Sequence, residues 1–140
     1  MKKFLFLLLT LTLSFGMVAC DGSNESKEQA ELLDLTGTWV QTNSNSEDAW
    51  QEAVISDGII EINWVSDGGD TKSLYWVGSY DAPTEAVNEY VWTSNNDTEK
   101  TEFALLASSD ETKNFTYTDG ELSYEASALG TKMIIRMEKQ

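Results

Sequence analysis

Clusters of turn-forming residues interrupt the chain at short intervals after residue 35. The segments SDG, SDGGD, SNND, SSDE and TDG combine Asp, Asn, Ser and Gly, which are the residues that tight turns need. The stretches between them are too short for helices of ordinary length and are rich in β-branched and aromatic residues. This spacing predicts antiparallel hairpins, because parallel neighbours would need long crossover connections. The expected strands are 37–42, 49–55, 59–66, 71–80, 88–94, 101–107, 113–118, 121–128 and 131–138.

Apolar and polar residues alternate within most of these stretches, which is the pattern of a sheet with one buried face. The side chains expected to point inward are bulky. They are Trp39, Trp50, Ile60, Ile62, Trp64, Leu74, Trp76, Tyr90, Trp92, Phe103, Leu105, Phe115, Tyr117, Leu122, Tyr124, Met133 and Ile135. Eight or nine such strands in series predict an all-β, up-and-down barrel around one core, which also removes exposed edges. A sandwich of two sheets is the alternative.

The stretch LTGTWVQT, residues 35–42, resembles the Gly-x-Trp signature that opens the first strand of lipocalin-like barrels. Here the matching residues are Gly37 and Trp39. The resemblance implies that Trp39 lies at the closed end of the barrel and that an arginine of the last strand packs over it. Arg136, the single arginine of the chain, lies in the last expected strand. The resemblance therefore predicts Trp39 and Arg136 as a barrel-closing pair.

The first twenty residues, MKKFLFLLLTLTLSFGMVAC, have the three parts of an export signal: a basic start, an apolar stretch and small residues before a cleavage point. The tail Met17-Val18-Ala19-Cys20 resembles a bacterial lipobox, in which the cysteine receives a diacylglyceryl group and becomes the new N-terminus. We therefore expect a lipoprotein signal peptide at 1–19, then lipidated Cys20 and a polar tether to residue 34, with a helical turn near 26–35. The domain would follow at 35–140, on the extracytoplasmic side of the cell membrane.

The composition excludes several classes of function. The chain has no histidine, and its one cysteine is expected to carry lipid, so triads based on serine or cysteine with histidine are absent. With 9 basic and 24 acidic residues, nucleic acid is not an expected partner. Without Lys2 and Lys3, 7 basic residues would face 24 acidic ones, a net charge of −17. The Asp, Asn and Gly clusters lack the spacing of a calcium loop, so no metal is expected. No pair of carboxylates is placed for acid–base chemistry, so no catalytic residue is expected, and no cofactor either.

These features predict a lipid-anchored binding or interaction module, not an enzyme. Two partners are expected. The membrane holds the lipid on Cys20, and a basic protein of the envelope or the exterior binds the domain. The alternative, which follows from the lipocalin-like resemblance, is a carrier of a small apolar ligand. In that case Trp64, Trp76, Trp92 and Tyr124 would line the cavity. The number of large aromatic side chains favours a filled interior.

Overall fold

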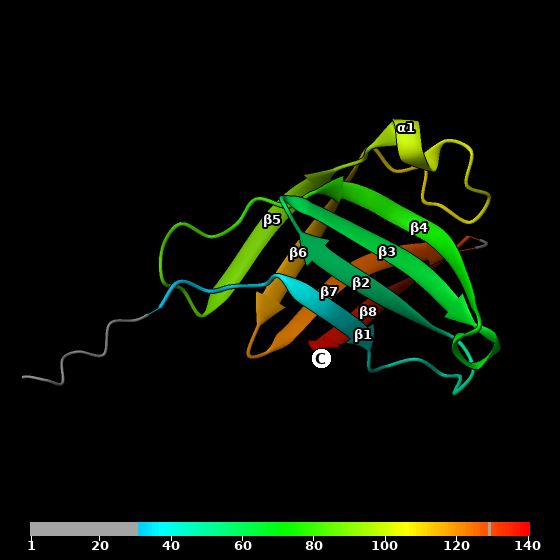
Figure 1. Ribbon diagram of the computed structural model, residues 1–140, viewed down its shortest axis with the longest axis horizontal. Helices are drawn as coiled ribbons and strands as arrows, with labels where there is room; N and C mark the ends of the chain where they lie inside the picture. Colours follow the sequence, from blue (N-terminus) through cyan, green and yellow to red (C-terminus); the bar gives the residue numbers. More distant parts are fainter. Residues whose placement is uncertain (1–30, 129) are drawn as a thin grey trace, which may run out of the picture. The chain divides into compact units, whose positions relative to one another are not determined.

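Eight antiparallel strands form one sheet in the computed structural model, which describes residues 31–128 and 130–140. The sheet curls into a half-barrel, with β1 to β4 on one side and β5 to β8 on the other (Figure 1). The strands are β1 (Gly37–Gln41), β2 (Trp50–Ser56), β3 (Ile59–Ser66), β4 (Thr71–Ser79), β5 (Glu89–Asn95), β6 (Thr112–Thr118), β7 (Glu121–Ala128) and β8 (Thr131–Lys139). The all-β meander is thus confirmed, as one sheet instead of a two-sheet sandwich.

The strand order is β4-β3-β2-β1-β8-β7-β6-β5, so consecutive strands pair within each half and β1 pairs with β8 to join the halves. The two edge strands, β4 and β5, face each other along a line that we call the seam. An isolated bridge between Gly78 and Asn96 crosses it. Side chains add to the bridge: the Trp92 indole donates to the Ser79 carbonyl at 3.1 Å, and the Asn95 amide donates to Ser79 Oγ at 2.9 Å.

The connections between strands alternate between the two ends of the half-barrel. One end carries 42–49 between β1 and β2, the 3-10 turn η2 (Asp67–Gly69) between β3 and β4, and 96–111 between β5 and β6, which contains α1 (Thr98–Thr101). We call this end the mouth. The opposite end carries 80–88 between β4 and β5 and two tight turns, each with an Asp at positive φ followed by Gly: Asp57-Gly58 and Asp119-Gly120. This Asp-Gly pattern is the one that two-residue hairpin turns favour.

The core lies between the two halves of the sheet and is mainly aromatic. Trp92 stacks on Phe115 with ring centroids 4.9 Å apart, and Phe115 contacts Tyr124 at 5.0 Å. Trp39 lies in the core toward the end opposite the mouth. Its indole N–H donates to the Leu35 carbonyl at 2.9 Å, and its ring makes a T-shaped contact with Tyr117. A chain of close-packed rings therefore runs along the interior, as expected for a filled core.

The segment before β1 is not helical where the structure describes it, from residue 31 onward. Asp34 accepts hydrogen bonds from the amide and the hydroxyl of Thr36, at 2.9 and 2.6 Å. Such local bonds give the backbone an alternative to a helix. The helical turn expected at 26–35 is therefore wrong over residues 31–35, and Leu35 instead packs into the core.

The ninth expected strand, 101–107, does not form. It contains the end of α1 and two successive turns, in which the Ala104 amide donates to Thr101 and the Ala107 amide to Ala104. The reason is that β5 pairs directly with β6, from Glu89–Thr118 to Asn95–Thr112, so no free edge remains for another strand between them. Phe103 and Leu105, expected to point inward, lie in solvent.

Candidate functional site: an exposed apolar loop at the mouth

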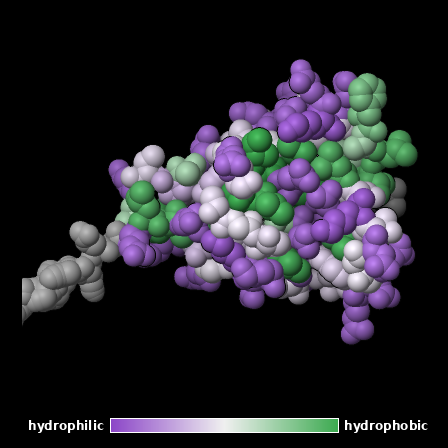
Figure 2. Space-filling view, in the orientation of Figure 1, coloured by the Kyte–Doolittle hydropathy of each residue, from purple (hydrophilic) through white to green (hydrophobic). Residues whose placement is uncertain are grey.

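The connection between β5 and β6 exposes three large apolar side chains at its tip. Phe103 is 85% exposed, Leu105 99% and Leu106 57%. We call residues 102–107 the apolar loop. Single exposed apolar residues are common on protein surfaces, whereas large contiguous apolar patches often belong to interaction sites. Figure 2 shows apolar atoms gathered beside hydrophilic ones at this end of the molecule.

Hydrogen bonds tie the connection 96–111, which contains the apolar loop, to the sheet on both sides of that loop. The Asp97 amide donates to the Val77 carbonyl at 2.8 Å, and the Ser108 amide donates to the Tyr75 carbonyl at 2.9 Å, so both ends are attached to β4. Asn96 ties the two ends together, since its side-chain amide donates to the Asp110 carbonyl at 2.8 Å. The apolar side chains are therefore presented from a fixed base.

A groove of about 500 Å³ separates the loop from the start of β4. Ala104, Leu105 and Leu106 form one wall, and Ser73 and Leu74 form the other. Leu105 and Leu106 thus belong both to the exposed side chains and to the wall of this groove.

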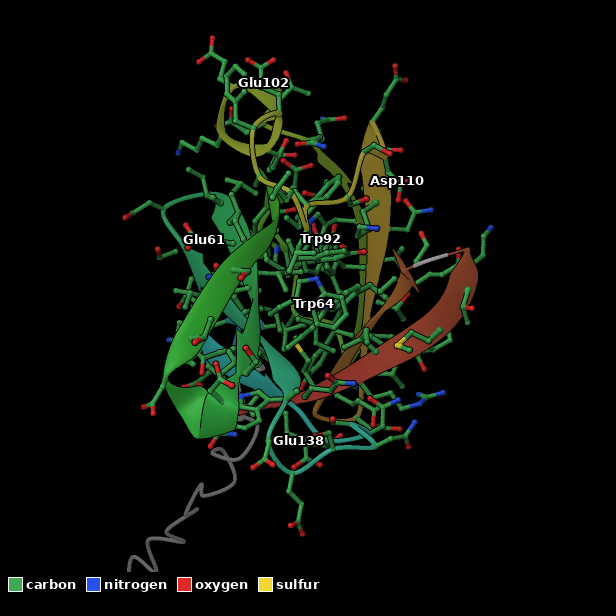
Figure 3. The ribbon with its side chains drawn as sticks, turned by 90° about the vertical axis from the view of Figure 1, so that its right-hand side faces the viewer. Glu61, Trp64, Trp92, Glu102, Asp110 and Glu138 are labelled. Carbon is green, nitrogen blue, oxygen red and sulfur yellow. The ribbon has the colours of Figure 1, made fainter. Side chains whose placement is uncertain are left out.

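Acidic residues surround this surface. The connection holds Asp97, Glu99, Glu102, Asp110 and Glu111. Its one lysine, Lys100, pairs with Asp97 at 3.7 Å, so it does not offset the remaining carboxylates. Figure 3 looks onto the mouth and shows Glu102 and Asp110 at the same end of the molecule. Exposed apolar side chains and carboxylates therefore lie together in this connection.

Lys113, the second residue of β6, holds the base of the loop from inside the half-barrel. Its side chain is buried, and its ammonium pairs with Asp110 at 3.0 Å and donates to the Glu125 carbonyl at 3.2 Å. The ammonium also lies 5.3 Å from the Tyr75 ring and 5.1 Å from the Trp76 ring, which are cation–π distances. The hydrogen bond from Lys113 is the main cause that lowers the pKa of Asp110 below its usual value.

The structure does not bring Trp39 and Arg136 together. Trp39 points into the core, whereas Arg136 lies on the outer face of β8 and pairs with Glu121 at 2.8 Å. The alternation of β8 explains the separation, because its neighbours Ile135 and Met137 are the buried ones. Opposite Trp39 on β8 lies Lys139, whose ammonium donates to the Asp34 carbonyl at 3.1 Å. Cys20 lies outside the described residues.

The four aromatic residues expected to line a cavity belong to the core. Trp76, Trp92 and Tyr124 are buried, and Trp64 is partly buried and packs against them. Burial is the first cause that raises the pKa of the Tyr124 phenol well above its usual value. Figure 3 shows Trp64 and Trp92 pointing into the space between the two halves of the sheet.

Sequence reasoning missed the polar residues of the interior and placed Trp50 on the wrong face of its strand. Trp50 was expected inward, but Gln51, Ala53 and Ile55 are the buried residues of β2. The Tyr124 hydroxyl donates to Gln51 Oε1 across the core. The alternation of Ala53 and Ile55 is the signal in the sequence that could have identified the buried face of this strand.

No helix within residues 31–128 or 130–140 is long and apolar enough to cross a bilayer. In the same residues, no group of three His, Cys, Asp or Glu side chains is arranged to hold a metal ion.

Comparisons with known proteins found no relative: no family model, no curated protein and no solved structure matches the chain. Its function is therefore inferred from its own residues.

Proposed function

We propose that the chain is a lipid-anchored, extracytoplasmic binding module that docks a basic protein through the apolar loop. The anchor and the location follow from the export pattern of residues 1–20 and from Cys20. The fold serves as a rigid, lipocalin-like scaffold, with the seam between β4 and β5 acting as its closure.

One observation carries the docking proposal: Phe103, Leu105 and Leu106 are exposed together in a connection that is bonded to β4 on both sides of them. Water contact with these side chains is unfavourable, and a partner that covers them gains the corresponding hydrophobic free energy. Interfaces concentrate their binding energy in a few such anchors surrounded by a polar rim.

Charge narrows the chemistry of the partner. The rim of the loop is acidic and the chain has a net charge of −15, so a basic partner would be attracted over a distance and oriented on approach. An anionic membrane surface is disfavoured for the same reason.

The alternative function, carriage of an apolar ligand inside the barrel, has less support. Trp92, Phe115 and Tyr124 occupy the interior in direct contact with one another, and a ligand in their place would have to displace close-packed rings.

Site-specific photo-crosslinking in the native cells tests the proposal. A photoreactive phenylalanine analogue at position 105 should give one covalent adduct, with a protein whose contact peptide is rich in Lys or Arg. The same analogue at Val91, which is 61% exposed on the outer face of β5, is the matched control and should not give that adduct. Equal adducts from both positions would contradict the proposal.

Affinity measurements with the identified partner provide the second test. Leu105→Ser should weaken binding at least tenfold, since a central apolar anchor is worth about 2 kcal/mol or more, whereas Val91→Ser should leave it unchanged. The association rate should fall as salt rises, because the rim charges are exposed. Affinity that is equal for both variants would exclude the apolar loop as the docking surface.

A further inference from the structure

The first half of β4 forms an open edge of the sheet at the mouth. β4 stands at one end of the strand order, and within the described residues its ladder is with β3 alone. From Tyr75 onward, other segments cover the edge, beginning with the Ser108 amide, which donates to the Tyr75 carbonyl at 2.9 Å. The stretch Thr71–Leu74, before this bond, is therefore free to accept another strand.

Alternation along the ladder shows which backbone groups this edge offers. In antiparallel pairs, every second residue bonds to one neighbouring strand, and the residues between them face the other side. The tight turn at 57–58 closes on a hydrogen-bonded pair, so Trp64 is one of the β3 residues that bond to β4, where it pairs with Ser73. The residues on either side of Ser73, Lys72 and Leu74, therefore direct their amide and carbonyl groups to the open side. No hydrogen bond among the described residues occupies these groups.

The groove between β4 and the apolar loop lies along this open edge. It measures about 500 Å³, with Ser73 and Leu74 on one wall and Ala104, Leu105 and Leu106 on the other. Consecutive residues of a strand point to opposite faces of the sheet, so a groove that touches both Ser73 and Leu74 runs along the edge itself. Figure 1 shows the connection that carries the apolar loop beside β4. A strand added here would lie between β4 and the exposed leucines.

The charges around the open edge favour a basic occupant. A lysine that reaches across an edge discourages strand addition, but the Lys72 ammonium pairs with Glu52 of β2 at 3.0 Å. Because β3 lies between β2 and β4, this pair holds the ammonium over the face of the sheet. The connection on the other side of the groove, 96–111, has five acidic residues and one lysine. A second copy of the chain, with its net charge of −15, would be repelled.

We propose that the open edge of β4 binds an extended, basic segment of the partner protein as an added strand. The segment would belong to the same partner that the apolar loop docks, so the inference rests on the proposed function. Backbone hydrogen bonds to Lys72 and Leu74 would supply affinity, and alternate side chains of the segment would contact Leu105 and Leu106. The free stretch of about four residues spans roughly 13 Å at about 3.3 Å per residue, and the occupied carbonyl of Tyr75 ends it.

Amide hydrogen exchange of the full chain, in a zwitterionic detergent, tests strand addition with a synthetic probe. The probe is a hexapeptide of alternating lysine and valine, and a hexapeptide of alternating glutamate and valine is the charge control. The basic peptide should bind with a dissociation constant of about 1 mM or tighter, and should slow exchange of the Lys72 and Leu74 amides about tenfold or more. The Ser73 amide, which faces β3, should keep its rate. The acidic peptide should change none of these rates.

Two substitutions at one position separate the backbone contribution from the side chain. Leu74→Pro and Leu74→Ala both remove the leucine side chain, but only proline removes the outward amide, which the ladder with β3 does not use. Leu74→Pro should therefore bind the basic peptide about fivefold more weakly than Leu74→Ala does. If Leu74→Pro does not fold, the peptide carries the change instead. Methylation of the amide nitrogens of either all its valines or all its lysines should abolish binding in one case only, because alternate amides face the edge.

The results distinguish strand addition from docking by the apolar loop. Peptide binding that protects neither Lys72 nor Leu74, or that responds equally to both methylation patterns, would overturn strand addition. If Leu105→Ser still abolishes that binding, the apolar loop remains the docking surface without an added strand. Absence of binding by the basic peptide up to about 10 mM would also overturn strand addition, while the cross-link at position 105 decides the docking proposal separately.

Discussion

The hydroxyl of Tyr124 on β7 donates a hydrogen bond to Oε1 of Gln51 on β2, across the interior of the half-barrel. The two residues come from opposite halves of the sheet, and both are buried. This contact links the halves at a level where the rest of the core is mainly apolar or aromatic.

Tyr124→Phe should lower the free energy of unfolding by about 1–3 kcal/mol, because it leaves the buried Gln51 oxygen without its donor. Tyr117→Phe, in a half-buried position on β6, is the control and should change stability by less than about 0.5 kcal/mol. Urea unfolding of both variants measures the difference. Equal stability of the two variants would mean that the bond contributes nothing.

Alkaline pH should destabilise the fold. Burial is the first cause that raises the pKa of Tyr80, Tyr90 and Tyr124 above the ordinary value of 10.0. The unfolded chain then releases these protons at lower pH than the folded chain, so stability is full below pH 10 and falls as pH rises beyond it. A titration followed by the absorbance of ionised phenol should show these tyrosines ionising late, together with unfolding. Ionisation of all five tyrosines near pH 10.0 in a chain that stays folded would contradict this.

Phe115→Ala should cost about 3–5 kcal/mol, because the side chain is fully buried between the rings of Trp92 and Tyr124. Leu105→Ala should cost almost nothing, since this side chain is 99% exposed. Thermal unfolding of the two variants compares a core position with one at the tip of the apolar loop. A large loss for Leu105→Ala would mean that the loop packs against the fold.

Gly78→Ala should destabilise the seam by about 1–3 kcal/mol, the usual cost of overpacking. A methyl group at this position would collide with Ser94 Oγ, and would lie 2.6 Å from Trp76 Nε1 and 2.7 Å from the Asn95 carbonyl oxygen.

Gly120→Ala provides the comparison for Gly78→Ala, since it has open space but a positive φ of 86°. It should cost about 1–2 kcal/mol through backbone strain alone. Hydrogen exchange separates the two effects: only Gly78→Ala should speed exchange of the Asn95 and Asp97 amides, which bond across the seam.

Asp110→Asn should loosen the apolar loop more than Lys113→Met does. The first change leaves a buried ammonium without its carboxylate, whereas the second removes the buried charge and keeps an apolar stem of similar length. Because the pKa of Asp110 is lowered, the pair should persist at neutral pH and be lost only when pH falls below the ordinary value of 3.8. Exchange of the Ser108 amide reports the state of the loop. Faster exchange in Lys113→Met than in Asp110→Asn would contradict this account.

Turn chemistry and alternation predicted the strands well where each strand had a partner. The Asp-Gly turns at 57–58 and 119–120 fixed two hairpins, and Ile60 and Ile62 were placed on the correct face. The failure at 101–107 has a physical cause. Phe103 and Leu105 alternate as a strand would, but alternation does not say whether an edge is free to accept that strand.

The sequence also did not predict which side chains of β4 face the core. A register shift between Ile62 and Asn63 skips Tyr75, so that Trp76 pairs with Ile62 and Leu74 pairs with Asn63. Tyr75, Trp76 and Val77 are all buried in consequence. A bulge changes the side-chain period locally, and no local residue pattern announces it here. The pocket beside the 42–49 connection is lined by residues of distant segments, such as Trp64 and Met133, and no single stretch of sequence encodes it.

The order of the strands in the sheet indicates the order in which parts of the chain fold. Strands β1 to β4 form one local meander and strands β5 to β8 form another. Each can fold from its own hairpins, because its strands are neighbours in sequence. The two halves meet through β1 and β8, whose ladder runs only from Trp39–Lys139 to Gln41–Met137, and these partners are about a hundred residues apart. Closing so long a loop is slow compared with forming a hairpin. We therefore expect two four-stranded intermediates that form early, and a rate-limiting step in which their aromatic faces dock.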